Sequence, residues 1–243
     1  MENLAHSTST KAPFVAASPK KPRKPVRLNF HKMVERLPPA SVLTLHEVTW
    51  QDYEELLEKV GEAKGLRISF NEGVMQIMTL SIKHEGITAF VQDLVRIISL
   101  RRRCKILFFG SATMRLAKKE KGSEPDVCFY LQSVPLLKNA AQPDFAVDPP
   151  PDVVVEIDIH HQSLDKFPIY AALGVPELWR YDGKRCTLHG LENGAYVVLE
   201  TSTAMPMLTG EVLTGFLNRL QTEDQYDTLL AFEEWLNQIK DEG

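Results

Sequence analysis

Residues 150–159 read PPDVVVEIDI, the most strand-like stretch of the 243-residue chain. Its valines and isoleucines form a nearly continuous apolar run, and β-branched residues of this kind favour strands. A run without polar alternation is typical of a strand whose two faces are both buried. The sequence therefore predicts a central strand here.

Two acidic residues, Glu156 and Asp158, interrupt this run, and their spacing of two places both on one face of the strand. A buried strand carries charges only when they are paired or bound to a metal. Asp126 opens another predicted strand, EPDVCFYLQS, in the same Pro-Asp-Val setting. Carboxylates that converge at neighbouring strand ends would form an oxygen-rich site suited to Mg²⁺ or Mn²⁺. The alternative is an acidic strand end that meets solvent or a basic partner.

A lysine follows the same strand. Lys166 stands at the start of a short predicted helix, DKFPIYAALG, that leaves the carboxyl end of the strand. An ammonium group in that place would reach a metal-bound water or stabilise negative charge on a phosphodiester. The simpler interpretation is a salt bridge to Asp165 or Glu177, which would contribute little to stability.

Apolar periodicity and turn residues predict the elements on either side. They comprise a helix over 50–65 capped by Thr49, a hairpin over 66–78, a long amphipathic helix over 83–100, strands over 105–116 and 124–133, a surface loop over 132–150, a strand over 176–182, a hairpin over 186–200 and a helical stretch over about 211–240. This mixture predicts an α+β fold, with helices flanking a strongly curved mixed β-sheet.

Composition excludes several classes of protein. With 44% hydrophobic and 25% charged residues, the chain has ordinary globular proportions, which excludes a fibre or a wholly disordered protein. No apolar run approaches the roughly 20 residues of a membrane-spanning helix, so no membrane partner is expected. The three cysteines are widely spaced, which argues against a disulfide scaffold and favours a cytoplasmic location.

Charge is distributed unevenly along the chain. Residues 1–37 contain eight Lys or Arg and two Glu, a net charge of +6, which leaves 20 basic and 30 acidic residues for 38–243, a net charge of −10. The first segment also lacks apolar periodicity, which predicts a disordered basic arm over 1–37 and a domain over 38–243. The KKPRKPVR stretch of the arm suits nucleic acid or an anionic surface, although a solvated tail explains it equally well.

Three strings in order, EPDVCFY, PDVVVEIDI and DK-x3-Y-x3-GVPELWRYD, resemble the Uma-two family of the PD-(D/E)XK restriction-endonuclease-like superfamily. The resemblance extends from about Leu43 to Phe216. It implies a restriction-endonuclease-like core and a Mg²⁺-dependent endonuclease that acts on nucleic acid, with DNA as the favoured substrate.

The resemblance also implies roles for single residues. Asp126 matches the first metal-binding aspartate of the family and Glu156 the second acidic ligand. Asp158, a further metal ligand, stands where the superfamily usually has its lysine, and Lys166 takes over the role of that lysine from the following helix.

Two residues at the start of the long predicted helix are candidates for a supporting role. His84 matches a histidine of the family at this place, and Glu85 lies beside it, so either would extend the site. The alternative is a plain helix N-terminus, whose dipole suits Glu85 well and a protonated His84 badly.

The leading hypothesis is therefore an endonuclease in which a metal-activated water attacks the phosphodiester. The text after Glu156, EIDIHHQS, departs from the family and leaves open a catalytically inactive module that binds DNA or a protein partner. A third hypothesis is a hydrolase of small phosphoesters that uses His160 or His161. By analogy with superfamily nucleases, a homodimer would let two sites cut both strands of a duplex.

Overall fold

The computed structural model describes residues 32, 34, 36–61, 65–141, 143–145, 147–159 and 165–239. His160, His161 and almost all of the predicted basic arm lie outside the described residues. Val34, near the end of that arm, is buried in a hydrophobic cluster with Tyr53 and Phe70. The described residues do not test the predicted boundary between residues 37 and 38.

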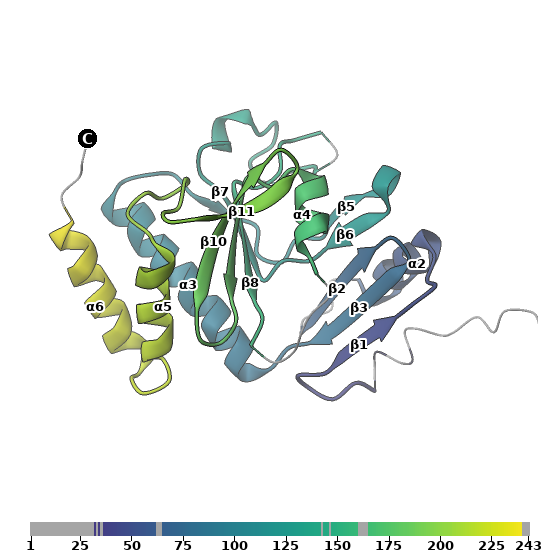
Figure 1. The fold of residues 1–243 in the computed structure, drawn as a ribbon, viewed down its shortest axis with the longest axis horizontal. Helices are drawn as coiled ribbons and strands as arrows, with labels where there is room; N and C mark the ends of the chain where they lie inside the picture. Colours follow the sequence, from purple (N-terminus) through teal and green to yellow (C-terminus); the bar gives the residue numbers. More distant parts are fainter. Residues whose placement is uncertain are drawn as a thin grey trace, which may run out of the picture.

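A six-stranded mixed sheet forms the centre of the molecule (Figure 1). Its order is β11-β10-β9-β8-β7-β4, and the strands are β4 (Leu107–Phe108), β7 (Val127–Tyr130), β8 (Val153–Ile157), β9 (Glu177–Tyr181), β10 (Cys186–Glu192) and β11 (Ala195–Leu199). Strand β8 runs antiparallel to β7 and parallel to β9. Every residue of β8 is buried, which confirms the predicted central strand.

The two faces of β8 pack against different helices. Val153, Val155 and Ile157 join the largest hydrophobic cluster, to which α3 (Ile82–Arg101), α5 (Gly210–Arg219) and α6 (Gln225–Gln238) contribute. Val154 joins a second cluster with Tyr170 of α4 (Phe167–Leu173). Because side chains alternate along a strand, Glu156 lies on the same face as Val154, toward α4.

A second sheet of five strands has the order β1-β3-β2-β6-β5. Its strands are β1 (Val42–Leu45), β2 (Leu66–Asn71), β3 (Val74–Thr79), β5 (Met114–Leu116) and β6 (Lys121–Ser123). Helix α2 (Trp50–Val60) packs on this sheet, with Tyr53 and Leu56 buried against Ile68 and Phe70. Helix α4 lies between the two sheets, next to β5, β6 and β11 (Figure 1). Two short 3-10 helices, η1 (Ala117–Lys119) and η2 (Val134–Leu136), complete the described elements.

The predicted α+β class, with a mixed sheet flanked by helices, is confirmed. Thr49 caps α2 through a capping box with Asp52, and the predicted hairpin, long helix and short helix after β8 are all present. Helix α2 ends at Gly61 rather than Gly65, because Gly61 already adopts a positive φ of 57°. The C-terminal stretch is helical as predicted and consists of two helices, α5 and α6.

The prediction of one strand over 105–116 is wrong. The chain breaks at Gly110, whose φ is 55°, so β4 joins the central sheet and β5 joins the second sheet. The predicted single curved sheet is thus two sheets in the structure, and this crossing segment connects them. Strands β1 and β6 were not expected from the sequence.

Among the described helices, none combines the length and the apolar character needed to traverse a bilayer. All three cysteines lie within the described residues and are free, with Cys128 and Cys186 buried.

Candidate active site

Asp126 and Glu156 face each other across two neighbouring strands. Val127 pairs with Val155 in the antiparallel register of β7 and β8, so the next pair along places Asp126 opposite Glu156. Directly opposed residues project their side chains from the same face of a sheet. The backbone N–H of Ile157 donates to Asp126 Oδ2 at 2.8 Å, which fixes this carboxylate at the strand end. Both side chains are buried, with exposures of 1% and 2%.

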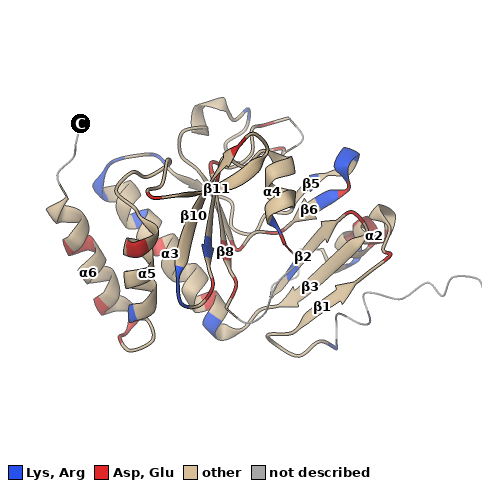
Figure 2. Ribbon diagram, in the orientation of Figure 1, with Lys and Arg blue, Asp and Glu red and all other residues tan. Residues whose placement is uncertain are grey.

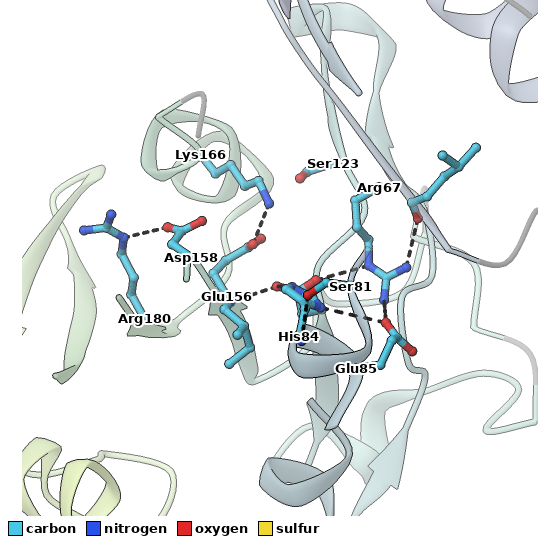
Figure 3. Close-up of polar contacts among 12 residues, drawn as sticks. Arg67, Ser81, His84, Glu85, Ser123, Glu156, Asp158, Lys166 and Arg180 are labelled. Carbon is cyan, nitrogen blue, oxygen red and sulfur yellow. Dashed lines mark hydrogen bonds and ion pairs between the residues drawn. The ribbon is translucent and has the colours of Figure 1, made fainter. Parts of the chain in front are cut away.

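Lys166 forms an ion pair with Glu156 in this buried setting. Lys166 occupies the N-cap position of α4, and its Nζ lies 2.5 Å from Glu156 Oε2 (Figure 3). The simpler interpretation expected an ion pair of Lys166 with Asp165 or Glu177. In the structure, Lys166 pairs with Glu156 instead. Removing two charged groups from water costs a desolvation free energy of roughly several kcal/mol per ion, which the attraction between them must offset. Such a pair is therefore more characteristic of a functional site than of a stabilising contact.

The second oxygen of Glu156 accepts a hydrogen bond from the Tyr170 hydroxyl on α4. Tyr170 also contacts Ser123 Oγ at 3.0 Å, and Ser123 lies 2.9 Å from Ser69 Oγ on β2. A chain of hydroxyl groups therefore connects Glu156 to the second sheet. Because both of its oxygens have partners, the Glu156 carboxylate is held in one orientation.

Burial sets the protonation of Glu156. Desolvation raises the pKa of Glu156 to about 7; Lys166 counteracts this shift, and the charges of Asp126 and Asp158 add to it. For Lys166, burial by itself would lower the pKa, but the charge of Glu156 and those of Asp126 and Asp158 raise it above its ordinary value. Lys166 is therefore a cation at neutral pH, whereas Glu156 titrates near neutrality.

Asp126 lies against two basic side chains, Arg67 and His84. Arg67 Nε donates to Asp126 Oδ1 at 3.2 Å, and His84 Nε2 lies 3.2 Å from Asp126 Oδ2. Burial would raise the pKa of Asp126, but its close contact with His84, followed by the charges of Lys166 and Arg67, brings it below its ordinary value. Asp126 is thus an ionised carboxylate inside the protein.

The supporting residues lie on the first turn of α3. The backbone N–H of His84 donates to the cap residue Ser81, and the imidazole is buried, with 1% exposure. Neither ring nitrogen forms a hydrogen bond of good geometry with a described residue, although Nε2 is close to Asp126. Glu85 is half-exposed, and its Oε1 lies 3.9 Å from Arg67 Nη2 (Figure 3).

Asp158 is engaged elsewhere. Arg180 Nε on β9 donates to Asp158 Oδ2 at 2.7 Å (Figure 3). Within the described ranges, no three His, Cys, Asp or Glu side chains are grouped so that they could hold a metal ion. The structure thus places Asp126, Glu156, Lys166 and His84 together. Glu85 is linked to this group by Arg67, which lies close to both Glu85 and Asp126. Asp158 pairs with Arg180 instead.

The donor set suits a hard divalent cation. Mg²⁺ keeps several of its waters in proteins and is usually held by one or two carboxylates, a number that Asp126 and Glu156 supply. The unsatisfied ring nitrogens of His84 provide a further polar group for a coordinated water. Asp126 and Glu156 would therefore hold the ion.

Arg67, Tyr170 and Ser123 were not identified from the sequence as parts of the site. For Arg67 a signal exists, because strand alternation in LRISFN places Ile68 and Phe70 on the core face and directs Arg67 and Ser69 to the other. A charged residue in a largely buried strand needs a partner, and that partner is Asp126.

The titration of Glu156 predicts how stability depends on pH. A carboxyl group whose folded-state pKa is raised from 4.5 to about 7 stabilises the fold below pH 4.5, and this stabilisation is lost as the pH rises through about 7. From about pH 5 to about pH 8, this titration should lower the free energy of unfolding of the parent by about 2–3 kcal/mol, and Glu156→Gln should lack that decrease. Urea denaturation in EDTA measures this difference. The same pH dependence in both proteins would show that Glu156 does not titrate in this range.

The chain matches a family of known proteins and resembles a solved structure. Residues 50–221 match the model of the Uma2 family, described as "Putative restriction endonuclease". A solved structure titled "Crystal structure of a putative nuclease belonging to DUF820 from Anabaena variabilis ATCC 29413" aligns with 70% of this chain and 99% of that chain, at 15% sequence identity and a TM-score of 0.47. No curated protein matches. The family match spans most of the chain and includes Arg67, His84, Asp126, Glu156 and Lys166, so the chain belongs to the Uma2 family, the Uma-two family that its sequence resembles.

Proposed function

We propose that this protein is a divalent-metal-dependent endonuclease that hydrolyses phosphodiester bonds of nucleic acid. The observation that supports it most is the buried arrangement of Asp126 opposite Glu156 with Lys166 beside them. Two carboxylates and an ammonium group at one strand end combine sites for a cation and for an anionic phosphate. Family membership points to the same reaction.

Mg²⁺ or Mn²⁺ held by Asp126 and Glu156 would supply Lewis-acid activation of water and of the scissile phosphate. Asp126 is suited to hold it, because its lowered pKa keeps it ionised. Asp158 would add a third ligand if it exchanged its contact with Arg180 for the cation. The other steps fall to side chains of the protein.

Lys166 carries a positive charge in a fixed position, from which it would stabilise the negative charge that develops on the phosphate. Its long side chain approaches from α4, so the ammonium group needs no large movement to meet a phosphate next to Glu156 (Figure 3). Tyr170 orients Glu156, and Arg67 with His84 keeps Asp126 charged. Lys166, Glu156 and Asp126 would thus already be in place when substrate binds, which is the arrangement that electrostatic catalysis requires.

For the substrate we propose nucleic acid, with DNA favoured, and a homodimer would bring two sites to the two strands of a duplex. Residues 38–243 are acidic overall, which opposes tight binding of a polyanion. Lys118 and Lys119 lie together in η1, between β5 and β6, where the ribbon in Figure 2 is coloured for basic residues. A cytoplasmic location would fit the three free thiols.

Cleavage of end-labelled single- and double-stranded DNA and RNA by the purified protein tests the proposal. Cleavage is expected with Mg²⁺ or Mn²⁺ and should stop in EDTA. Cleavage that persists in EDTA would contradict the metal requirement. Binding without cleavage of any of these substrates would contradict the enzyme and favour an inactive nuclease-fold module.

A further inference from the structure

A cleft of about 620 Å³ is lined by Arg67, the residue that donates a hydrogen bond to Asp126. Its wall includes Arg67 of β2, Glu85 of α3, Thr113 from the segment between β4 and β5, and Glu124 from the segment between β6 and β7. The volume falls within the range of ligand-binding clefts. Glu124 is engaged in the wall, because it accepts hydrogen bonds from the Ile68 N–H at 2.9 Å and from Thr113 Oγ1 at 2.8 Å. Arg67 is thus the cationic side chain among the residues that line the described cleft.

The Arg67 guanidinium uses only part of its hydrogen-bonding capacity within the described residues. Nε donates to Asp126 and Nη1 donates to the Leu66 carbonyl at 2.9 Å. Nη2 lies 3.9 Å from Glu85 Oε1, which is beyond hydrogen-bonding distance. A guanidinium has five N–H groups, so three of them make no hydrogen bond with the described residues.

Glu85 differs from the other partners of Arg67. Its side chain is 55% exposed, whereas that of Asp126 is fully buried. Glu85 therefore provides a loosely held negative charge beside Nη2 of Arg67 (Figure 3), and both residues line the cleft. The planar guanidinium fork matches the oxygens of a phosphate better than an ammonium group does.

We propose that Arg67 binds a backbone phosphate of a nucleic-acid strand in this cleft, and that Glu85 occupies the place of this phosphate when no strand is bound. This inference rests on the proposed nuclease function and specifies where the substrate strand lies. Arg67 links the strand to the site directly, because the same guanidinium holds Asp126. The substrate phosphate and the metal-binding carboxylate would then share one cation.

Salt-dependent binding of a short fluorescein-labelled single-stranded DNA, measured in EDTA, tests this assignment. For Arg67→Gln, Kd should rise by at least about tenfold, as expected when a charged hydrogen bond is lost. The slope of log K against log salt concentration should also fall by about 0.7, the value for one phosphate contact on a single strand. A purely structural role of Arg67 would leave this slope unchanged.

Arg101→Gln is the matched control for Arg67→Gln. Arg101 is also paired with a glutamate, Glu233, but lies at the opposite end of α3 from His84. This variant should retain the Kd and the salt slope of the parent. A slope that falls equally in both variants, or in neither, would overturn the assignment of Arg67.

Glu85→Gln gives an independent test that leaves the buried pair of Arg67 and Asp126 in place. Removal of the competing carboxylate should lower Kd by about two- to fivefold, as expected for a half-exposed ion pair. Glu211→Gln, the same change on α5, controls for net charge and should leave Kd unaltered. Unchanged or weaker binding by Glu85→Gln would overturn the proposal that Glu85 takes the place of the phosphate.

Cleavage by the parent in Mg²⁺, measured alongside, separates the two proposals. A parent that binds the oligonucleotide but cleaves no nucleic acid contradicts the proposed function. A parent that cleaves, while Arg67→Gln keeps its salt slope, contradicts only the inference about Arg67.

Discussion

Replacement of Lys166 by methionine is expected to reduce the rate of nucleic-acid cleavage by about 10²- to 10³-fold, the loss typical when one preorganised charge-stabilising group is removed. The Lys166 ammonium is the charged group closest to Glu156, at 2.5 Å. Methionine retains much of the length of the side chain but carries no charge. The measurement is the single-turnover cleavage rate in Mg²⁺.

Glu156 should let this variant remain folded. Its pKa, already raised to about 7 by burial, would rise further without Lys166, so Glu156 would take up a proton instead of remaining an unpaired buried charge. The control is Lys184→Met, the same substitution at an exposed lysine after β9, which should cleave like the parent. A folded Lys166→Met protein that cleaves at the parental rate would exclude Lys166 from the reaction.

Replacement of Asp126 by asparagine is expected to abolish cleavage and to lower the free energy of unfolding by about 3–5 kcal/mol, the cost of breaking a buried ion pair. The carboxylate of Asp126 meets Arg67, His84 and the Ile157 N–H. Asparagine retains the acceptor for the N–H but leaves Arg67 without its buried counter-charge. Cleavage assays and urea denaturation of the same preparation measure the two effects.

A variant of a second buried aspartate, Asp152, is the control that distinguishes a loss of catalysis from a loss of stability. Asp152 lies before β8, at the end of the strand away from Asp126, and accepts hydrogen bonds from Leu131 N, Ser133 N and Ser133 Oγ at 2.6, 2.9 and 2.6 Å. Asp152→Asn should lower stability by about 1–3 kcal/mol and leave cleavage intact below the unfolding transition. If cleavage instead falls in both variants in proportion to stability, Asp126 has only a structural role.

The sequence predicts the centre of this fold well because its signals are local. The apolar run over 153–157 requires cover on both faces, and the structure provides α3 on one face and α4 on the other. The capping box of Thr49 and the hairpin around Gly73 likewise depend on residues within a few positions of each other. For the break the sequence offers only Gly110 itself, since a glycine inside a strand pattern can equally mark a bulge within one continuous strand.

In the candidate site, too, the residues with local sequence signals could be predicted and the others could not. The spacing of Glu156 and Asp158 and the Pro-Asp-Val setting of Asp126 indicated carboxylates at neighbouring strand ends, and the structure has Asp126 opposite Glu156. The alternation rule also placed Asp158 there, but the rule takes no account of Arg180 on the adjacent strand. The roles of Asp126, Glu156, Asp158, Lys166, His84 and Glu85 in catalysis or metal binding remain predictions.

Residues that come from the second sheet could not be inferred from spacing. Arg67 is 59 positions from Asp126, and Ser123 is 47 positions from Tyr170. These pairs depend on how the two sheets meet around α4, a tertiary arrangement that no local pattern of residues encodes. Arg67 is one of the groups that lower the pKa of Asp126.

Calorimetric titration of Mn²⁺ into the parent protein and into Glu156→Gln tests the proposed metal site most directly. Glu156→Gln removes one of the two carboxylates and keeps the shape of the side chain. The parent should bind Mn²⁺ at one site, and the variant should show no binding under the same conditions. Equal binding by both proteins, or by neither, would contradict a metal site formed by Asp126 and Glu156.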